Sequence, residues 1–402
     1  MNQSLQPNLN YENDIIYVTK YSRWILVSIG IWPASLKGSA KFLSKIAIGF
    51  GNLVLFFAII PFSLHIVLEQ KDTVIMLKML GFLSFCLISV LKYWALAMRK
   101  PKIERCIELM QTDWKQVEFR RNRHMMLKYG KVGRDLTILC IVFMYSGGTI
   151  YHTIMQYAIG SFIDEHNRTI KPLVYPTYSA LYDVQKIHVY VLVYTVHCMC
   201  GYVIYSVTAG ACGLAALFAT HTCGQIDIVL SRLNGLVDDN LMRHDDLNER
   251  LIEIVEHHLR TLRFSAMMET VLQEVCFLEF VGSTFMICLL EYYTIVDWKQ
   301  SNTIGLTTYT LLLISLTFNI FILCYIGDLL IEKSTSIGTS SFEIDWYRLP
   351  TKTIRGLILI IAMSNNPVKI SAGGIVTLSL STFVNVLKSS LGYLSFLRTV
   401  VV

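Results

Sequence analysis

The chain has 402 residues, of which 53% are hydrophobic and only 16% are charged, and its mean hydropathy is +0.49. Soluble globular proteins carry about 25% charged residues, so this composition excludes an ordinary soluble domain and predicts a membrane protein. The net charge of +6 does not indicate nucleic-acid binding, because the basic residues lie between apolar segments and form no single stripe.

Seven apolar segments follow one another along the chain. A bilayer core takes ~20 apolar residues, and each segment is long enough to cross it as a helix. The predicted spans are 46–68, 74–97, 136–158, 187–219, 271–296, 304–326 and 371–397. A shorter apolar stretch, Trp24 to Trp32, is flanked by basic residues. It predicts an interfacial helix anchored by its two tryptophans, and it does not look like a cleavable signal peptide.

The basic residues alternate between the two sides of these spans. Of the 35 Lys and Arg, 26 lie in the N-terminal segment and in the second, fourth and sixth connections. Positively charged connections stay in the cytoplasm. We therefore expect an all-α membrane protein with seven transmembrane helices, a cytoplasmic N-terminus and an extracellular C-terminus. That orientation is opposite to a G-protein-coupled receptor and excludes that class.

The connections predict how the chain is organised. Residues 1–45 form a cytoplasmic N-terminal segment, and 46–326 hold six transmembrane helices with long cytoplasmic connections at 98–135 and 220–270. Residues 327–370 form a cytoplasmic anchor segment, and 371–402 form the seventh helix and an extracellular tail. Apolar residues recur at helical spacing in 220–270, so the fourth and fifth spans should extend below the membrane into a helical layer suited to inter-subunit contact.

The third connection, 159–186, is expected outside the cell and contains the sequon Asn167-Arg168-Thr169. Asn167 is either glycosylated or a chance match to the motif. None of the ten cysteines falls in a connection predicted to lie outside, so no outer disulfide is expected. No residue pattern indicates a metal, a cofactor or an enzyme active site.

The last span carries polar residues at steps of three or four, which places them on one helix face. They include Thr377, Ser381, Asn385, Gly392 and Ser395. Such a face is either a tightly packed seam against another helix or the wall of a water-lined pathway, and the residue types suit both.

Several motifs together resemble one known family. The C-terminal motifs are Trp346-Tyr347-Arg348-Leu349-Pro350, Asn366-Pro367, Ala372-Gly373-Gly374 and Thr382 to Ser390, followed by Tyr393 and Leu397. The upstream motifs are Met110-Gln111-Thr112-Asp113-Trp114, and His257-His258 with Phe264. This set resembles insect odorant receptors, and in particular their ligand-tuning subunits. The upstream Met110-to-Trp114 motif is similar to that of hymenopteran members of the family.

The resemblance implies an odorant-gated, non-selective cation channel subunit in the plasma membrane of olfactory neuron dendrites. Such a subunit forms a heterotetramer with the odorant co-receptor, and its seventh helix lines a central pore. By this resemblance the pore and gate residues are Asn385, Gly392, Ser395, Phe396, Thr399 and Val400.

The family binds small volatile ligands in the outer half of the helix bundle, between helices two, three, four and six. The corresponding residues here are Met79, Phe82, Leu83, Tyr145, Gly148, Thr149, His152, Tyr194, Tyr309 and Leu312. Gly148 and His152 lie one turn apart, so we expect room for a ligand beside Gly148. Ordinary interhelical packing is the alternative for each aromatic residue.

Two other functions remain open. One is a gustatory-type chemoreceptor channel, although the Thr-Phe-Val-Asn-Val-Leu-Lys-Ser-Ser run at 382–390 favours the odorant branch. The other is an inverted seven-helix receptor that signals through a cytoplasmic partner bound to 220–270. A transporter is not favoured, because no paired helix breaks mark two repeated halves.

Overall fold

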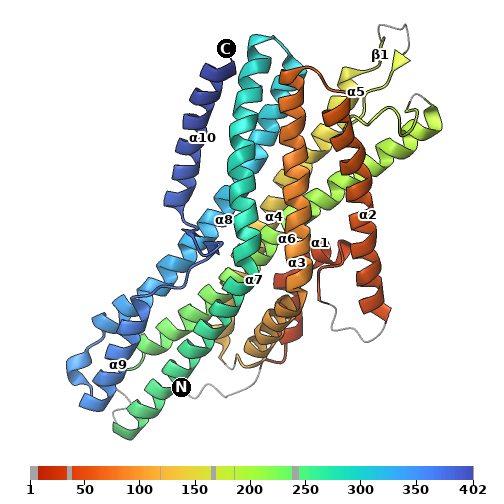
Figure 1. The fold of residues 1–402 in the computed structure, drawn as a ribbon. Helices are drawn as coiled ribbons and strands as arrows, with labels where there is room; N and C mark the ends of the chain where they lie inside the picture. The colour runs from red at the N-terminus through yellow and green to blue at the C-terminus, as the bar shows by residue number, and fades with distance from the viewer. Residues whose placement is uncertain are drawn as a thin grey trace.

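The chain folds into a bundle of long helices, seen in a computed structural model that describes residues 8–33, 39–117, 119–163, 169–184, 186–237 and 244–401 (Figure 1). The first half contains α1 (Tyr11–Ser28), α2 (Ser39–Leu68), α3 (Thr73–Lys115), α4 (Arg120–Thr149), a π-helical turn η1 (Ile150–Ile154), α5 (Met155–Ile159), β1 (Phe162–Ile163) and β2 (Thr169–Ile170). The second half contains α6 (Ile187–Asn234), α7 (His244–Lys299), α8 (Thr303–Glu343), the 3₁₀ turn η3 (Trp346–Arg348), α9 (Thr351–Ser364), β3 (Ser371–Ala372), β4 (Val376–Thr377) and α10 (Leu380–Val401).

The α2–α3 and α7–α8 connections lie at one end of the bundle, which we name the upper end after its place in Figure 1. The C-terminus and the short β1–β2 hairpin lie there too, and α9 lies at the opposite, lower end. Within the described ranges, six helices are long and apolar enough to cross a membrane, namely α2, α3, the α4–α5 rod, α6, α7 and α8. The 22 residues of α10 would cover ~33 Å at 1.5 Å per residue, which is long enough for a seventh crossing.

The fourth and fifth predicted spans are parts of much longer helices. α6 has 48 residues and α7 has 56, so both extend well past the ~20 residues that a bilayer core requires. Their lower ends, with α8 and the short amphipathic α9, form a packed helical layer (Figure 1).

α6 is the centre of the bundle. It packs against α1, α2, α3, α4, α7 and α8, and its most apolar 18-residue window is completely buried. Small residues between Ala209 and Ala219 allow this close packing, since they let neighbouring backbones approach. One example is Gly213, whose carbonyl oxygen accepts a 3.2 Å hydrogen bond from Ser22 on α1. The hydrophobic core therefore surrounds α6 along the bundle.

Two predicted boundaries are wrong. The seventh helix begins at Leu380 instead of residue 371, because residues 371–377 form an antiparallel hairpin. Gly373 and Gly374, at φ of +64° and +73°, make the turn of that hairpin. The N-terminal helix is α1, which ends at Ser28 and so includes Trp24 but not Trp32.

Candidate functional site

A small enclosed cavity lies in the upper half of the bundle, between α3, α4 with η1, α6, α7 and α8. Its volume is about 30 Å³, which is about the share of liquid volume that one water molecule takes. Aromatic and aliphatic side chains dominate its wall, and a few polar groups interrupt them. The lining residues are Phe82, Phe85, Met144, Gly148, Tyr151, His152, Tyr175, Ile204, Tyr205, Met286, Leu290, Leu312, Ser315 and Leu316.

His152 is the polar centre of this wall. Its Nδ1 lies 3.1 Å from the Gly148 carbonyl oxygen and 2.9 Å from the Tyr205 hydroxyl, and its Nε2 lies 3.1 Å from the Tyr175 hydroxyl. A carbonyl oxygen can only accept, so in the neutral ring Nδ1 carries the proton and Nε2 accepts from Tyr175. A hydrogen-bond donor of a ligand can therefore replace the Tyr175 hydroxyl at Nε2 of His152.

The π-helical turn explains how α4 presents its residues. Consecutive residues on an α-helix point in different directions, yet Tyr151 and His152 are both buried and both line the cavity. The wider η1 turn, Ile150–Ile154, accommodates both side chains on the inner side. Such single π turns are frequent at functional sites.

Two glycines let the large rings of this site approach the helix backbones. A Cβ on Gly148 would lie 2.1 Å from Cε2 of Tyr205, and a Cβ on Gly201 would lie 2.5 Å from Nε2 of His152. The space beside Gly148 is therefore filled by Tyr205, and the expectation of free room for a ligand there is wrong.

Tyr175 closes the cavity from the connection between β2 and α6. It is 4% exposed although its segment is not helical, and its ring meets His197 of α6 at a centroid distance of 5.0 Å. Burial raises the pKa of Tyr175 well above 10, so its hydroxyl stays protonated and can donate to His152. Behind this ring, neither ring nitrogen of the fully buried His197 has a hydrogen-bond partner within the described chain.

The cavity brings together four of the ten predicted ligand residues: Phe82, Gly148, His152 and Leu312. The Tyr194 hydroxyl donates to the His152 backbone oxygen at 2.7 Å, and the Tyr145 hydroxyl lies 2.6 Å from that of Ser206, so both act beside the cavity. Tyr309 packs on Tyr293, outside the cavity wall. Met79 and Leu83 also lie outside it, and Thr149 is exposed.

Sequence reasoning missed Tyr175, Tyr205 and the α7 residues Met286 and Leu290. Tyr205 lies on a helix that was expected to contribute, and its position opposite Gly148 follows only from the packing of α4 on α6. Tyr175 stands next to Pro176 in the third connection, 159–186, and the available signal was the length of that connection, which is sufficient to fold over a cavity mouth.

A buried ion pair lies one helical turn below the cavity. Lys92 Nζ is 2.7 Å from Glu279 Oε2, with the two side chains 2% and 3% exposed. Thr208 accepts from the same Nζ at 2.8 Å, and Asn319 and Ser283 donate to Glu279 Oε1 at 2.7 and 2.9 Å. These contacts tie α3, α6, α7 and α8 together directly beneath Tyr205 and Ser315.

Three of the six predicted pore residues are described, and they lie on the free side of α10. α10 packs against α7 and α8, through Phe383 on Phe321 and through Ser390, whose hydroxyl donates to Glu291 Oε1 at 3.0 Å. Asn385, Gly392 and Ser395 are exposed and face away from these helices. This polar face is therefore not a seam within the chain. The side chains of Phe396, Thr399 and Val400 lie outside the described residues, as does the sequon residue Asn167.

No group of three or more His, Cys, Asp or Glu side chains within the described residues could hold a metal ion.

Comparison with known proteins identifies the family. The sequence profile of the 7tm odorant receptor family matches residues 72–391. Odorant receptor 13a of Drosophila melanogaster is 27% identical over 287 residues, which cover 65% of this chain and 64% of that protein. The putative odorant receptor 92a of the same species is 24% identical over 327 residues, covering 79% and 77%. The chain thus spans a little under two-thirds of the length of odorant receptor 13a.

Solved structures show the same fold. The olfactory receptor OR5 of Machilis hrabei, in complex with eugenol, superposes with a TM-score of 0.77 at 14% identity, covering 97% of this chain and all of that one. A second structure of the same receptor superposes with a TM-score of 0.74. The relatives are multi-pass membrane receptors and not enzymes. The chain described here therefore belongs to the insect 7tm odorant receptor family.

Proposed function

We propose that this chain is the ligand-tuning subunit of an odorant-gated, non-selective cation channel. In this proposal it binds a small volatile organic ligand in the upper cavity and opens a central pore lined by α10. It acts as a heterotetramer with the odorant co-receptor, in the plasma membrane of olfactory neuron dendrites, with the N-terminus inside and the C-terminus outside.

The observation that carries the proposal is that the same two helices bound the cavity and hold α10. Leu290 of α7 lines the cavity, and the next residue, Glu291, accepts the hydrogen bond from Ser390 of α10. On α8, Leu316 lines the cavity and Phe321, about one turn further on, packs on Phe383 of α10. A change in the cavity that shifts α7 or α8 is thereby passed to α10 through direct contacts.

The size of the cavity supports gating by a population shift. About 30 Å³ is far below the 300 Å³ or more of typical ligand pockets, so a ligand requires a more expanded conformation. Outward movement of Tyr175 would join the cavity to the unpaired ring of His197 and provide that volume. A ligand that binds the expanded conformation better shifts the population toward it, and only this difference in affinity opens the channel.

The proposed tetramer would cover two exposed surfaces of the chain, the polar face of α10 and an apolar surface at the lower end. One α10 helix cannot enclose a pore, whereas four of them with Asn385, Gly392 and Ser395 turned inward can line one. Phe396, Thr399 and Val400 would form the gate near the upper end. At the lower end, Phe342, Tyr347, Ile358 and Leu359 are each more than half exposed, and inter-subunit contact in the anchor layer would cover them.

Two of the comparisons support this function. The family profile is that of odorant receptors, which favours the odorant over the gustatory alternative. The Machilis receptor of the same fold is described in complex with eugenol, a small organic molecule, and we extend that ligand class to this chain. The inverted receptor that signals through a cytoplasmic partner remains the other candidate.

Voltage clamp of cells that express this chain with the co-receptor tests the proposal. A panel of volatiles should evoke a cation current that is absent when the co-receptor is expressed alone with the same panel. A rise of a soluble second messenger without any cation current would instead favour the inverted receptor and remove the channel function.

A further inference from the structure

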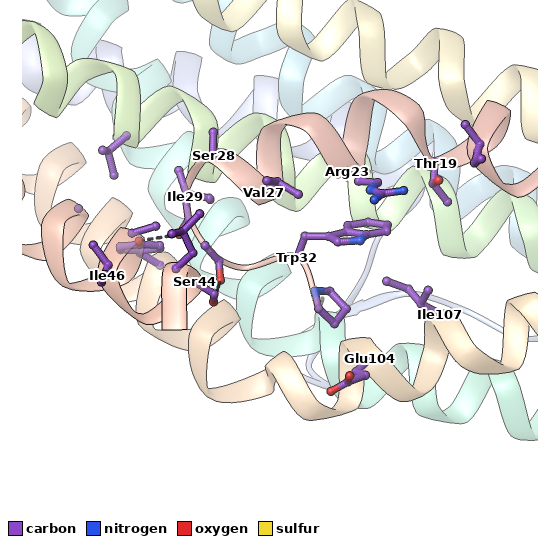
Figure 2. Close-up of a pocket in the computed structure, with 18 of the residues that line it drawn as sticks. Thr19, Arg23, Val27, Ser28, Ile29, Trp32, Ser44, Ile46, Glu104 and Ile107 are labelled. Atoms are coloured by element: carbon purple, nitrogen blue, oxygen red, sulfur yellow. Dashed lines mark hydrogen bonds between the residues drawn. The ribbon is translucent and has the colours of Figure 1, made fainter. Parts of the chain in front are cut away.

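A second and much larger cavity lies in the lower half of the bundle, between α1, α2, α3 and α6. Its volume is about 1080 Å³, and it is partly open to the outside of the chain (Figure 2). It shares no lining residue with the upper cavity. The proposed odorant function therefore does not use it.

One part of the wall is apolar and exposed. Phe50 on α2 and Met199 and Tyr202 on α6 line the cavity, and each is 41% to 52% exposed. Leu43 and Ile46, in the first turns of α2, line it as well and are 69% and 51% exposed. Apolar surface of this extent on the side of a membrane helix bundle requires a hydrocarbon cover.

The other part of the wall is charged. Arg23 on α1 and Glu104 on α3 approach the cavity from different helices, with the Trp32 indole between them in the view of Figure 2. Within the described part of the chain, no hydrogen bond or ion pair is formed by either Arg23 or the half-buried Glu104. Glu12 and Glu108 add two more carboxylates. Two more cations lie beside them, because Lys100 Nζ donates to the Gly30 carbonyl oxygen of the wall at 2.9 Å and Arg105 pairs with Glu108 at 3.1 Å. Charges of both signs therefore balance at this wall.

The cavity is long enough to span one bilayer leaflet. Its lining on α3 extends from Tyr93 to Gln111, which is ~27 Å at 1.5 Å per residue. A leaflet with its head groups is roughly 20 Å thick, since the whole bilayer is about 40–45 Å. Along α3 the aromatic Tyr93 comes first and the carboxylates of Glu104 and Glu108 come later, which is the order of an acyl chain followed by its head group.

The charges specify which head group fits. Arg23 presents a guanidinium, the side chain that suits a phosphate, and the carboxylates attract a cationic group. Trp32 and Tyr11 add aromatic faces, which favour an ammonium. A head group with no net charge matches the balanced charges of this wall better than a head group with a net negative charge does. We propose that this cavity is a binding site for a zwitterionic phospholipid, with the phosphate at Arg23, the ammonium at Glu104 and Glu108, and one acyl chain along Phe50 and Met199.

Quenching of tryptophan fluorescence by brominated lipid tests the site, because Trp32 lies in its wall. The full-length chain is reconstituted in nanodiscs of mixed phosphatidylcholine and phosphatidylglycerol, with bromine carried on only one of the two lipids. Subtracting the fluorescence of the Trp32→Phe variant from that of the wild-type chain gives the fluorescence of Trp32 alone. Subtracting that of Trp24→Phe isolates Trp24, which is 62% exposed on α1 and reports ordinary surrounding lipid.

We expect brominated phosphatidylcholine to quench Trp32 about threefold more than brominated phosphatidylglycerol does, and both to quench Trp24 equally. Arg23→Gln and Glu104→Gln should each lower the ratio of quenching by the two brominated lipids at Trp32 to the value seen at Trp24. Lys102→Gln, an exposed neighbour of Glu104 that does not line the cavity, should leave it unchanged. The Trp24 signal shows that each variant remains folded in the bilayer. Equal quenching of Trp32 by the two lipids, or none by either, would overturn the site.

Discussion

His152 links two tyrosine hydroxyls that come from different parts of the chain. Tyr205 lies on α6 and Tyr175 in the preceding connection, and both hydroxyls meet the His152 ring within 3.1 Å. A ligand that enters must either use this ring or leave it paired with protein. If the proposed odorant site is used, the ring should favour ligands that form hydrogen bonds over ligands that do not.

Replacing His152 with Leu should separate these two classes of odorant. For ligands with a hydroxyl or carbonyl, we expect the half-maximal concentration to rise about tenfold, which corresponds to roughly 1.4 kcal/mol for one lost hydrogen bond. A hydrocarbon of similar size should be nearly unaffected. Dose–response curves of odorant-evoked current measure both. Tyr194→Phe is the control, since it removes a hydrogen bond to the His152 backbone but no cavity group. Equal shifts for both ligand classes would contradict this role.

Gly148 should be intolerant of even one methyl group. In Gly148→Ala the new Cβ would lie 2.1 Å from the Tyr205 ring, which must move away from His152. Such overpacking costs roughly 1–3 kcal/mol, so we expect a marked loss of odorant sensitivity or of surface expression. The matched control is Gly49→Ala on α2, where nothing lies within 4 Å of the added Cβ. Wild-type responses of Gly148→Ala would show that Tyr205 can relocate freely.

Helical spacing predicted part of this site and could not predict the rest. It identified Gly148 and His152 correctly, because both follow from one face of one helix. It misplaced Thr149, since a helix face is known from sequence only relative to its own residues and not to its neighbours. Tyr175 lies in an irregular segment, where no periodicity fixes the direction of a side chain.

At the scale of the helices, the Lys92–Glu279 pair is the strongest polar link in the upper bundle. Breaking a buried pair leaves the remaining charge without compensation, so Glu279→Gln should destabilise the protein by about 3–5 kcal/mol. Thermal unfolding in detergent measures this. The double variant Lys92→Met with Glu279→Leu should recover a large part of the loss, because an apolar pair needs no compensation.

The control for this pair is Arg105→Gln. It breaks the Arg105–Glu108 pair, whose side chains are more than half exposed, and exposed pairs contribute about 0–1 kcal/mol. If Glu279→Gln lowers the unfolding midpoint no more than Arg105→Gln does, the buried network contributes nothing specific to stability.

The sequence predicted the helices better than their ends. Apolar length located all six long helices, and the periodicity of 220–270 predicted the extension of α6 and α7. The start of α10 was placed nine residues too early, because Ser371 to Thr377 is apolar enough to extend a span. Only the two consecutive glycines, Gly373 and Gly374, marked the turn, and their positive φ values belong to the folded hairpin.

For the whole molecule, the distribution of Lys and Arg predicts the orientation. We expect an epitope tag at the C-terminus to be labelled on intact cells and a tag at the N-terminus only after permeabilisation. Fluorescence labelling of both tagged chains in one cell line measures this. Labelling of the N-terminal tag on intact cells would reverse the orientation and place α10's free end in the cytoplasm.

Assembly and ligand identity lie beyond what the sequence predicts. The exposed polar face of α10 and the exposed apolar residues near α9 lie on one chain, whereas the proposed assembly would cover them with other chains. In the proposed function, the shape that a ligand meets arises when Tyr175 and Tyr205 move.

The complete burial of α6 from Val203 to Ile226 has a consequence for how this receptor can diversify. Helices that face lipid must keep apolar surfaces, because hydrocarbon cannot satisfy polar groups. This buried stretch of α6 is released from that demand, and it already carries Ser206, Thr208 and Thr220. A substitution in this stretch has to fit only the neighbouring side chains. New chemical preferences can therefore arise through exchanges along α6 while membrane insertion, which depends on the outer helices, is left intact.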